Sequence, residues 1–296
     1  MQRYYLIAFE IVMLILLYFC LKYAWRHGGW PAIWVLFAGV IFGWLLEWAT
    51  IMQLSAYEYG NFILKIGPLP LCIGIGWGVI IYSAMLFSDA SSLPEWARPL
   101  LDALLALNID LAMDAIAIRV GMWDWGQGLN FNYFGVPYAN FWAWFWVVFS
   151  FSAALRLLRH LPSWAGRWLA PMGAITLSTL VVLGTNALIV YVLWPAGLSE
   201  TSNAFVLLSA LAMVMALQPK FNQRPMEPLV FWVPFAFHIT FLIMGLHSGV
   251  ILQPPILLIV SLMMLAIALY LHRGVFSKLF VEKVVSSQKA GETSEV

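Results

Sequence analysis

The sequence predicts an all-α protein that crosses a membrane about nine times, or eight if two neighbouring segments form one helix. Hydrophobic residues make up 63% of its 296 residues, charged residues only 10%, and the mean hydropathy is +0.87. Soluble domains are usually about half apolar and a quarter charged, so this composition excludes a water-soluble globule. Apolar runs of about 20 residues, each long enough to cross a bilayer core, recur along the whole chain.

Hydropathy and helix breakers place these spans in order at about 4–23, 32–53, 68–88, 99–120, 138–158, 169–194, 203–218, 229–249 and 254–272. The first is a membrane helix rather than a cleavable signal, because it contains Glu10 and no small-residue cleavage site follows it. The breakers are "RHGGWP", "YEYGNFILKIGP", "SDASSLPEW", the Trp-rich loop before Tyr138, "RHLPSWAGR", "WPAGLSET", "QPKFNQRPMEP" and "LQPP". We therefore expect a single transmembrane helical domain over 1–272 and a polar tail over 273–296.

The basic residues divide unequally between the two sets of loops. Twelve lie on one side: Lys22, Arg26, Arg98, Arg156, Arg159, Arg167, Lys220, Arg224, Arg273, Lys278, Lys283 and Lys289. Three lie on the other: Arg3, Lys65 and Arg119. The positive-inside rule then puts the C-terminus in the cytoplasm and the N-terminus outside, in the inner membrane of a cell.

Other motifs are more consistent with packing than with chemistry. Cys20 and Cys72 lie in apolar runs without CxxC spacing, which argues against a disulfide framework or a zinc site. The "GVIFG" of 39–43 and the "GIGWG" of 74–78 are expected to be sites of close helix packing, because no strand precedes the second one.

Ionisable residues within the spans are the candidates for function, because charge is costly in a membrane. Asp110 and Asp114 are four residues apart and share one helix face. The topology places four further polar residues at a similar depth in the outer half of the membrane: Glu10, Glu47, Asn186 and His247. The Trp-rich loop and the "AYEYGNF" loop are on the same side. Together these residues could line one pocket.

Two facing carboxyl groups in an apolar site repel each other, so at least one keeps its proton at neutral pH. A magnesium site of the prenyltransferase type would need a second aspartate cluster, and Asp89, Asp102 and Asp124 stand alone in the sequence. Arg119, five residues from Asp114, is not on the aspartate face. A di-iron enzyme would need many intramembrane histidines, and the chain has five in all. We therefore expect no metal.

The stretch from Asp110 through "GMWDW", "YFGVP" and Asn140-Phe141, with the upstream "LEWATI", "YEYGNF" and "GPLPLCIGIGW", resembles the carotenoid biosynthesis membrane-protein family. That family includes the γ-carotene and bisanhydrobacterioruberin hydratases. The likeness is good over residues 40–145. Ala115 stands where a proline often follows the second aspartate, and Trp142 begins a departure from the family's Gly-Trp.

The resemblance implies that water adds across the terminal C1–C2 double bond of an acyclic ψ end group, without a cofactor. In the mechanism that we expect, Asp110 or Asp114 protonates the alkene and the companion carboxylate stabilises the cation. A partner carboxylate, with Glu47 as the candidate, takes a proton from water. The remaining predicted residues contact the cation, the water or the substrate: Tyr59, Trp77, Trp123, Trp125, Tyr133 and Asn140. The expected partners are a lipophilic carotenoid, water and membrane lipid, with association with other carotenoid enzymes in the same membrane but no nucleic acid.

Two other functions fit the same residues. A proton-coupled transporter could use the aspartates as a relay, although no inverted repeat is visible. An isoprenoid cyclase would share the first protonation and then lose a proton instead of capturing water. The sequence does not separate hydration from cyclisation.

Overall fold

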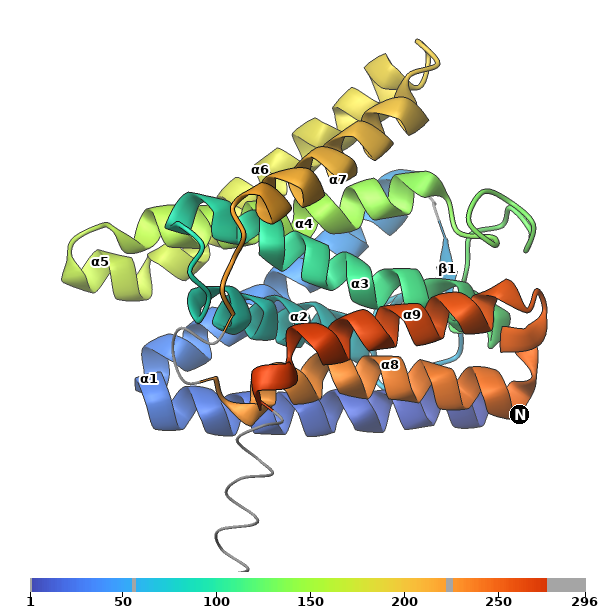
Figure 1. Cartoon of the computed structure of the whole chain (residues 1–296), viewed down its shortest axis with the longest axis horizontal. Coiled ribbons are helices and arrows are strands. Elements are labelled where there is room, and N and C mark those ends of the chain that lie inside the picture. Colours follow the sequence, from blue (N-terminus) through green and yellow to red (C-terminus); the bar gives the residue numbers. More distant parts are fainter. Residues whose placement is uncertain (1, 55–56, 222–225, 276–296) are drawn as a thin grey trace, which may run out of the picture.

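The structure is a computed structural model, and it describes residues 2–54, 57–221 and 226–275. All nine predicted apolar segments are helical (Figure 1). The first two are halves of α1 (Gln2–Leu54), which leaves helical geometry at Gly29 (φ 59°, ψ −147°) within the predicted "RHGGWP" breaker. The other helices are α2 (Leu71–Asp89), α3 (Arg98–Arg119), α4 (Tyr138–Arg159), α5 (Ser163–Trp168), α6 (Ala170–Leu188), α7 (Ser199–Ala216), α8 (Pro228–Ser248) and α9 (Ile256–Leu271).

Short elements connect these helices. Two 3₁₀ turns, η1 (Glu95–Ala97) and η3 (Val250–Leu252), precede α3 and α9, and a π-helical turn, η2 (Ile189–Leu193), extends α6. The four strands are only two residues long: β1 (Glu58–Tyr59), β2 (Lys65–Ile66), β3 (Leu69–Pro70) and β4 (Trp123–Asp124). They pair antiparallel as β1 with β4 and β2 with β3.

The helices confirm the all-α polytopic membrane fold. Within the described residues, six helices are long and apolar enough to cross a membrane. This count takes the kinked α1 as one helix and joins η2 to α6. The helix α9 is apolar but shorter, and α3 is less apolar because Asp102, Asp110 and Asp114 interrupt it. The side of the membrane that each end faces stays a prediction, and the predicted tail falls mostly outside the described residues.

The helix α3 lies at the centre of the bundle, in contact with α2, α4, α7, α8 and α9. In Figure 1 the N-terminus and β1 lie toward one end of the bundle, whereas α5 lies at the other, and α6 and α7 extend away beyond α4. The Trp-rich loop therefore shares its end of the bundle with the loop that follows α1.

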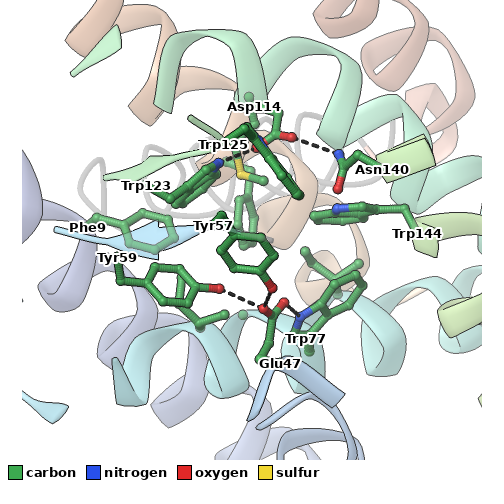
Figure 2. A pocket seen from close by; sticks show the side chains of 15 residues that line it. Phe9, Glu47, Tyr57, Tyr59, Trp77, Asp114, Trp123, Trp125, Asn140 and Trp144 are labelled. Carbon is green, nitrogen blue, oxygen red and sulfur yellow. Dashed lines mark hydrogen bonds between the residues drawn. The ribbon is translucent and has the colours of Figure 1, made fainter. Parts of the chain in front are cut away.

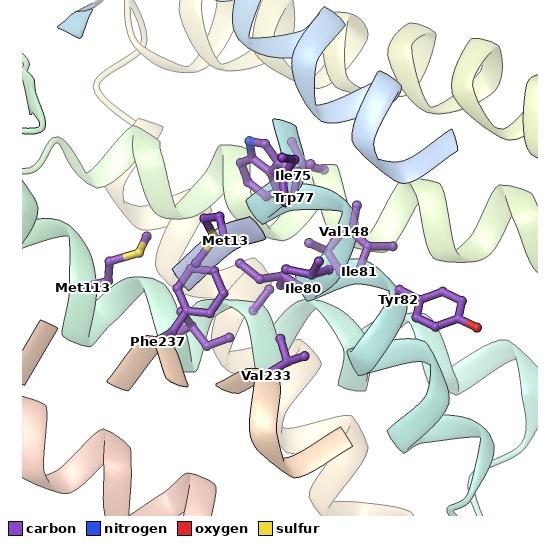
Figure 3. Packing of buried hydrophobic residues seen from close by; sticks show 14 of the residues in the cluster. Met13, Ile75, Trp77, Ile80, Ile81, Tyr82, Met113, Val148, Val233 and Phe237 are labelled. Atoms are coloured by element: carbon purple, nitrogen blue, oxygen red, sulfur yellow. The ribbon is translucent and has the colours of Figure 1, made fainter. Parts of the chain in front are cut away.

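Glycines bring the second half of α1 against α2, as the two glycine motifs predicted. A Cβ added to Gly39 would lie 3.2 Å from the Cα of Gly78, and one on Gly43 would lie 2.2 Å from the Cβ of Trp77. A larger side chain would overlap Trp77 at Gly43 and press on the α2 backbone at Gly39, so glycine lets the two backbones approach closely. Figure 3 shows another part of the core, in which Met13 and Phe237 pack beside α2 at Gly76.

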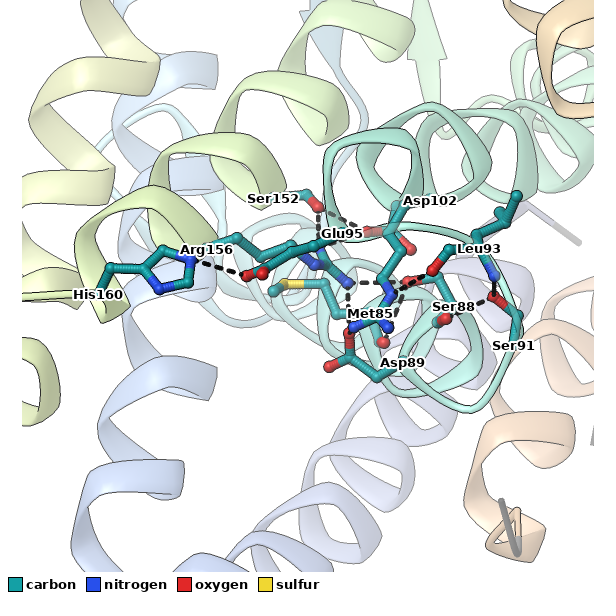
Figure 4. A network of polar contacts seen from close by, with 11 residues as sticks. Met85, Ser88, Asp89, Ser91, Leu93, Glu95, Asp102, Ser152, Arg156 and His160 are labelled. Carbon is teal, nitrogen blue, oxygen red and sulfur yellow. Dashed lines mark hydrogen bonds and ion pairs between the residues drawn. The ribbon is translucent and has the colours of Figure 1, made fainter. Parts of the chain in front are cut away.

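A buried ionic cluster joins α2, α3 and α4 near the end of the bundle opposite β1 (Figure 4). The Arg156 guanidinium donates to Asp102 at 2.8 Å, to Asp89 at 2.9 Å and to the Ser88 hydroxyl at 2.8 Å. Asp89 and Asp102 stand apart in the sequence, but the fold brings both to one arginine from a distant helix. This arginine occupies the position that a cation would take between the two carboxylates.

Candidate active site

A small chamber of about 60 Å³ lies between α1, α2, α3, α4 and α8, under the two loops that carry β1 and β4 (Figure 2). Carboxyl groups of Asp114 and Glu47 lie on facing sides of it. Most of the wall between them is aromatic or apolar: Phe9, Tyr57, Tyr59, Ile73, Gly76, Trp77, Ile80, Met113, Trp123, Trp125, Trp144 and Phe237, with Asn140.

On the α3 side, one amide joins the two aspartates. The Nδ2 of Asn140, in the first turn of α4, donates to Asp114 Oδ2 at 2.7 Å and to Asp110 Oδ2 at 3.1 Å. The indole N–H of Trp123 donates to the other oxygen of Asp114 at 2.8 Å. Because the aspartates are four residues apart on one helix, a single side chain from α4 reaches both. Asp114 lines the chamber, whereas Asp110 is fully buried behind it.

On the α1 side, three donors converge on Glu47. The hydroxyl of Tyr59 donates to Oε2 at 2.8 Å, the hydroxyl of Tyr57 donates to the same oxygen, and the indole of Trp77 donates to Oε1 at 2.8 Å. Gly43 lies one helical turn before Glu47 and gives the Trp77 ring the space to reach it. The carboxylate is therefore held in a fixed orientation by groups from two segments, the loop that carries β1 and the helix α2.

The pairing of β1 with β4 fixes the lid of the chamber. Tyr59 is opposite Trp123 in this short ladder, and the Gly60 N–H donates to the Met122 carbonyl at 2.9 Å. A Cβ at Gly60 would lie 2.4 Å from the Gly121 carbonyl oxygen, so this approach requires glycine. The pairing therefore places Tyr59, which donates to Glu47, beside Trp123, which donates to Asp114.

The partners of the two chamber carboxyl groups are neutral. Burial raises the pKa of Tyr57 and of Tyr59 well above the ordinary value, and the neighbouring Glu47 raises both further. Both tyrosines therefore remain phenols that donate hydrogen bonds. No lysine, arginine or histidine lines the chamber, and within the described residues no group of three or more His, Cys, Asp or Glu could hold a metal ion.

Most of the predicted site residues lie together. The chamber collects seven of them: Glu47, Tyr59, Trp77, Asp114, Trp123, Trp125 and Asn140. Asp110 joins through Asn140. Tyr133 does not line the chamber: its hydroxyl donates to the Leu111 carbonyl at 2.8 Å, and its ring packs edge-on against Phe141. The loop turns this ring against the side of α3, and the expected contact between Tyr133 and a cation stays a prediction.

Three other polar residues expected in the pocket lie elsewhere. Glu10 accepts from the Leu64 N–H at 2.8 Å, and His247 bonds the Tyr5 hydroxyl at 2.7 Å. Asn186 lines a separate cavity between α1 and α6. The topology suggested one pocket because it placed these residues at a similar depth, but depth does not fix the direction in which a helix face points. Phe9 lines the chamber, so Glu10, one residue on, is turned about 100° away from it.

Several chamber residues escaped the sequence prediction. Trp144 is four residues after Asn140 on α4, and this helical spacing could have identified it. Tyr57 precedes Tyr59 by two residues in the same loop. Phe9, Met113 and Phe237 are apolar residues in apolar helices, and nothing in their sequence context distinguishes them from the core.

Comparison with known proteins gives one match. The model of a family described as carotenoid biosynthesis protein matches residues 1–206, a longer stretch than the predicted 40–145. No curated protein and no solved structure matches the chain. The matched part includes both carboxyl groups of the chamber, the Asn140 bridge and all the aromatic residues of its wall except Phe237. The chain therefore belongs to the carotenoid biosynthesis protein family.

Proposed function

We propose that this protein is a carotenoid hydratase, which adds water across the terminal C1–C2 double bond of an acyclic ψ end group. The observation that carries the proposal is the pair of carboxyl groups, Asp114 and Glu47, facing each other across a small aromatic chamber without a cation. Hydration of an unactivated alkene needs an acid on one side, a base near water on the other, and protection for a cation between them.

The acid in this proposal is Asp114, because its carboxyl group lines the chamber and Asp110 does not. In its carboxylic acid form, Asp114 gives its proton to C2 of the alkene, and the π electrons of the double bond form the new C–H bond. A tertiary cation remains at C1, beside the carboxylate that Asp114 has become. The faces of the surrounding tryptophans, such as Trp125 and Trp144, stabilise this charge.

The base is Glu47. A water oxygen donates an electron pair to C1, and one water proton passes to the Glu47 carboxylate, which gives the tertiary alcohol. The proton then returns from Glu47 to Asp114 through water, so the balance is one alkene and one water consumed for one alcohol formed. Three donors keep the Glu47 carboxylate oriented during the reaction.

Water reaches this site, in our proposal, from a second cavity. It measures about 760 Å³ and is lined by residues that include Glu58, Arg119 and Asp124. It shares three wall residues with the chamber, namely Tyr59, Trp123 and Trp125. The chamber itself has room for a few water molecules, since one water needs about 10–15 Å³ of cavity volume.

The test is expression in a bacterium that makes lycopene, followed by mass analysis of the pigments. We expect pigments heavier by one water for each end group converted. Asp114→Asn and Glu47→Gln should each abolish conversion while the protein remains folded in the membrane. Glu95→Gln is the matched control: this carboxylate is exposed, pairs with His160 at 3.2 Å and lies away from the chamber.

The same experiment separates the other functions. A pigment of unchanged mass but altered chromatographic retention would identify a cyclase, because a cation that loses a proton yields an isomer. An unchanged pigment would contradict both enzymatic readings and favour transport. Full conversion by Asp114→Asn would remove the acid from the mechanism even if hydration itself occurred.

A further inference from the structure

A groove of about 600 Å³ lies beside the chamber, between the Trp-rich loop, the start of α4 and the turn that joins α6 to α7. Its wall is largely apolar, with Phe131 and Pro137 on one side and Ile189, Val190 and Trp194 on the other. In Figure 1 the turn that joins α6 to α7 lies at the far tip of this helix pair. Its volume is within the usual range for ligand pockets, about 300–1,000 Å³.

The chamber is too small to hold a substrate end group as it stands. Its volume of about 60 Å³ is less than half of the roughly 150 Å³ of a cavity that binds benzene. A ψ end group with the next isoprene unit has more carbon atoms than benzene. The wall of the chamber must therefore move before the C1–C2 bond can lie between Asp114 and Glu47.

Trp125 is the residue that separates the two spaces, because it lines both the chamber and the groove. Its ring packs against Tyr57 at a centroid distance of 4.5 Å, and its buried indole N–H has no hydrogen-bond partner among the described residues. Packing alone thus holds the ring. Gly126 (φ 68°) and Gly128 (φ 79°) follow it in backbone conformations that glycine adopts readily.

We propose that the groove binds the isoprenoid chain of the lipid substrate, and that the end group passes Trp125 into the chamber. The identity of the ligand as an isoprenoid rests on the proposed function. Aromatic and aliphatic side chains form most of the wall and suit a polyene, which has no polar group along its length. Polar residues line the rest of the groove, namely Gln127, Asn132, Ser199, Glu200 and Asn203. Because the groove is ten times larger than the chamber, it accommodates the chain outside while only the reacting end is enclosed.

The test uses a thiol label as a plug, in the full chain and with Asp114→Asn to prevent turnover. The two natural cysteines are 0% and 2% exposed, so a bulky thiol reagent should react only with an introduced cysteine. Val190→Cys places it in the groove. Val181→Cys is the matched control, because both valines are 40% exposed, and Val181 precedes Val190 on the same helical segment without lining the groove.

Each purified protein, with labelling verified by its mass, is mixed with lycopene in detergent, separated from free pigment, and assayed for pigment bound per protein. We expect labelled Val190→Cys to lose most of the pigment that it binds unlabelled, and labelled Val181→Cys to keep it. Comparing each variant with itself before labelling excludes a folding defect. Equal retention by the two labelled proteins, or no retention by the unlabelled ones, would overturn the proposal.

The outcome is independent of the reaction type. With Asp114 intact, unlabelled Val190→Cys could yield an isomer instead of a hydrate, which would refute the hydratase while the groove still bound the substrate. Conversely, hydration that continues after the groove is plugged would leave the hydratase intact and refute this path.

Discussion

Replacing Asn140 by leucine removes the amide that joins Asp110 to Asp114 and leaves a side chain of similar size. The lost contacts are 3.1 Å to Asp110 and 2.7 Å to Asp114, at a residue only 9% exposed. A hydrogen bond to a charged group contributes about 1.5–3 kcal/mol. If this contribution is realised when Asp114 becomes a carboxylate beside the cation, turnover should fall about 10- to 150-fold, since about 1.4 kcal/mol is a factor of ten in rate.

The assay is the initial rate of pigment conversion in isolated membranes, divided by the amount of folded protein measured in detergent. Asn108→Leu is the matched control, because Asn108 is an asparagine of α3 that is 8% exposed. It donates to the Met264 carbonyl at 3.1 Å and bonds His238 at 3.0 Å, outside the chamber. This control should lose stability but keep its rate per folded molecule. An unchanged rate in Asn140→Leu, or an equal loss in Asn108→Leu, would refute the reasoning.

Three other changes test the support of the site. Gly43→Val should lower the free energy of unfolding by about 1–3 kcal/mol in a denaturation assay and lower turnover, because it displaces Trp77. Gly184→Ala is the control: its Cβ would meet no atom within 4 Å, so it should do neither. Tyr59→Phe should slow conversion without changing the pigment formed, because it removes one of three donors to a charged acceptor; a rate equal to the unaltered protein would contradict this. Arg156→Met should cost about 3–5 kcal/mol of unfolding free energy by leaving Asp102 buried and unpaired, and adding Asp102→Asn should recover part of that loss.

The fold was largely predictable from the sequence, because membrane insertion depends on apolar length, which is a local property. Each predicted span is helical, the first two as halves of α1, and the break at Gly29 falls in the predicted breaker. The glycine motifs also predicted contact correctly: Gly39 and Gly78 face each other. Such features need only a helical period and side-chain size.

The site was predictable in part. Asp110 and Asp114 could be placed on one face because both are on one helix, and Tyr59 and Trp123 could be placed in loops at one end of the bundle. The direction of each helix face was not predictable, since it depends on how neighbouring helices pack. Glu10 was expected in the pocket because of its depth, but its side chain is turned away and bonds the Leu64 N–H instead.

The protein has two buried clusters of acidic residues, and their surroundings suit them to different roles, one structural and one chemical. At Arg156, two carboxylates meet a permanent cation that neutralises them and ties three helices together. In the chamber, Asp114 and Glu47 meet only neutral donors, and the space between them is a cavity. A fixed cation there would hold Asp114 as a carboxylate, unable to give a proton, and would repel a developing carbocation. Neutral donors orient the same oxygens without either effect, so a chamber lining without a cation is what suits this cluster to the alkene protonation that we propose.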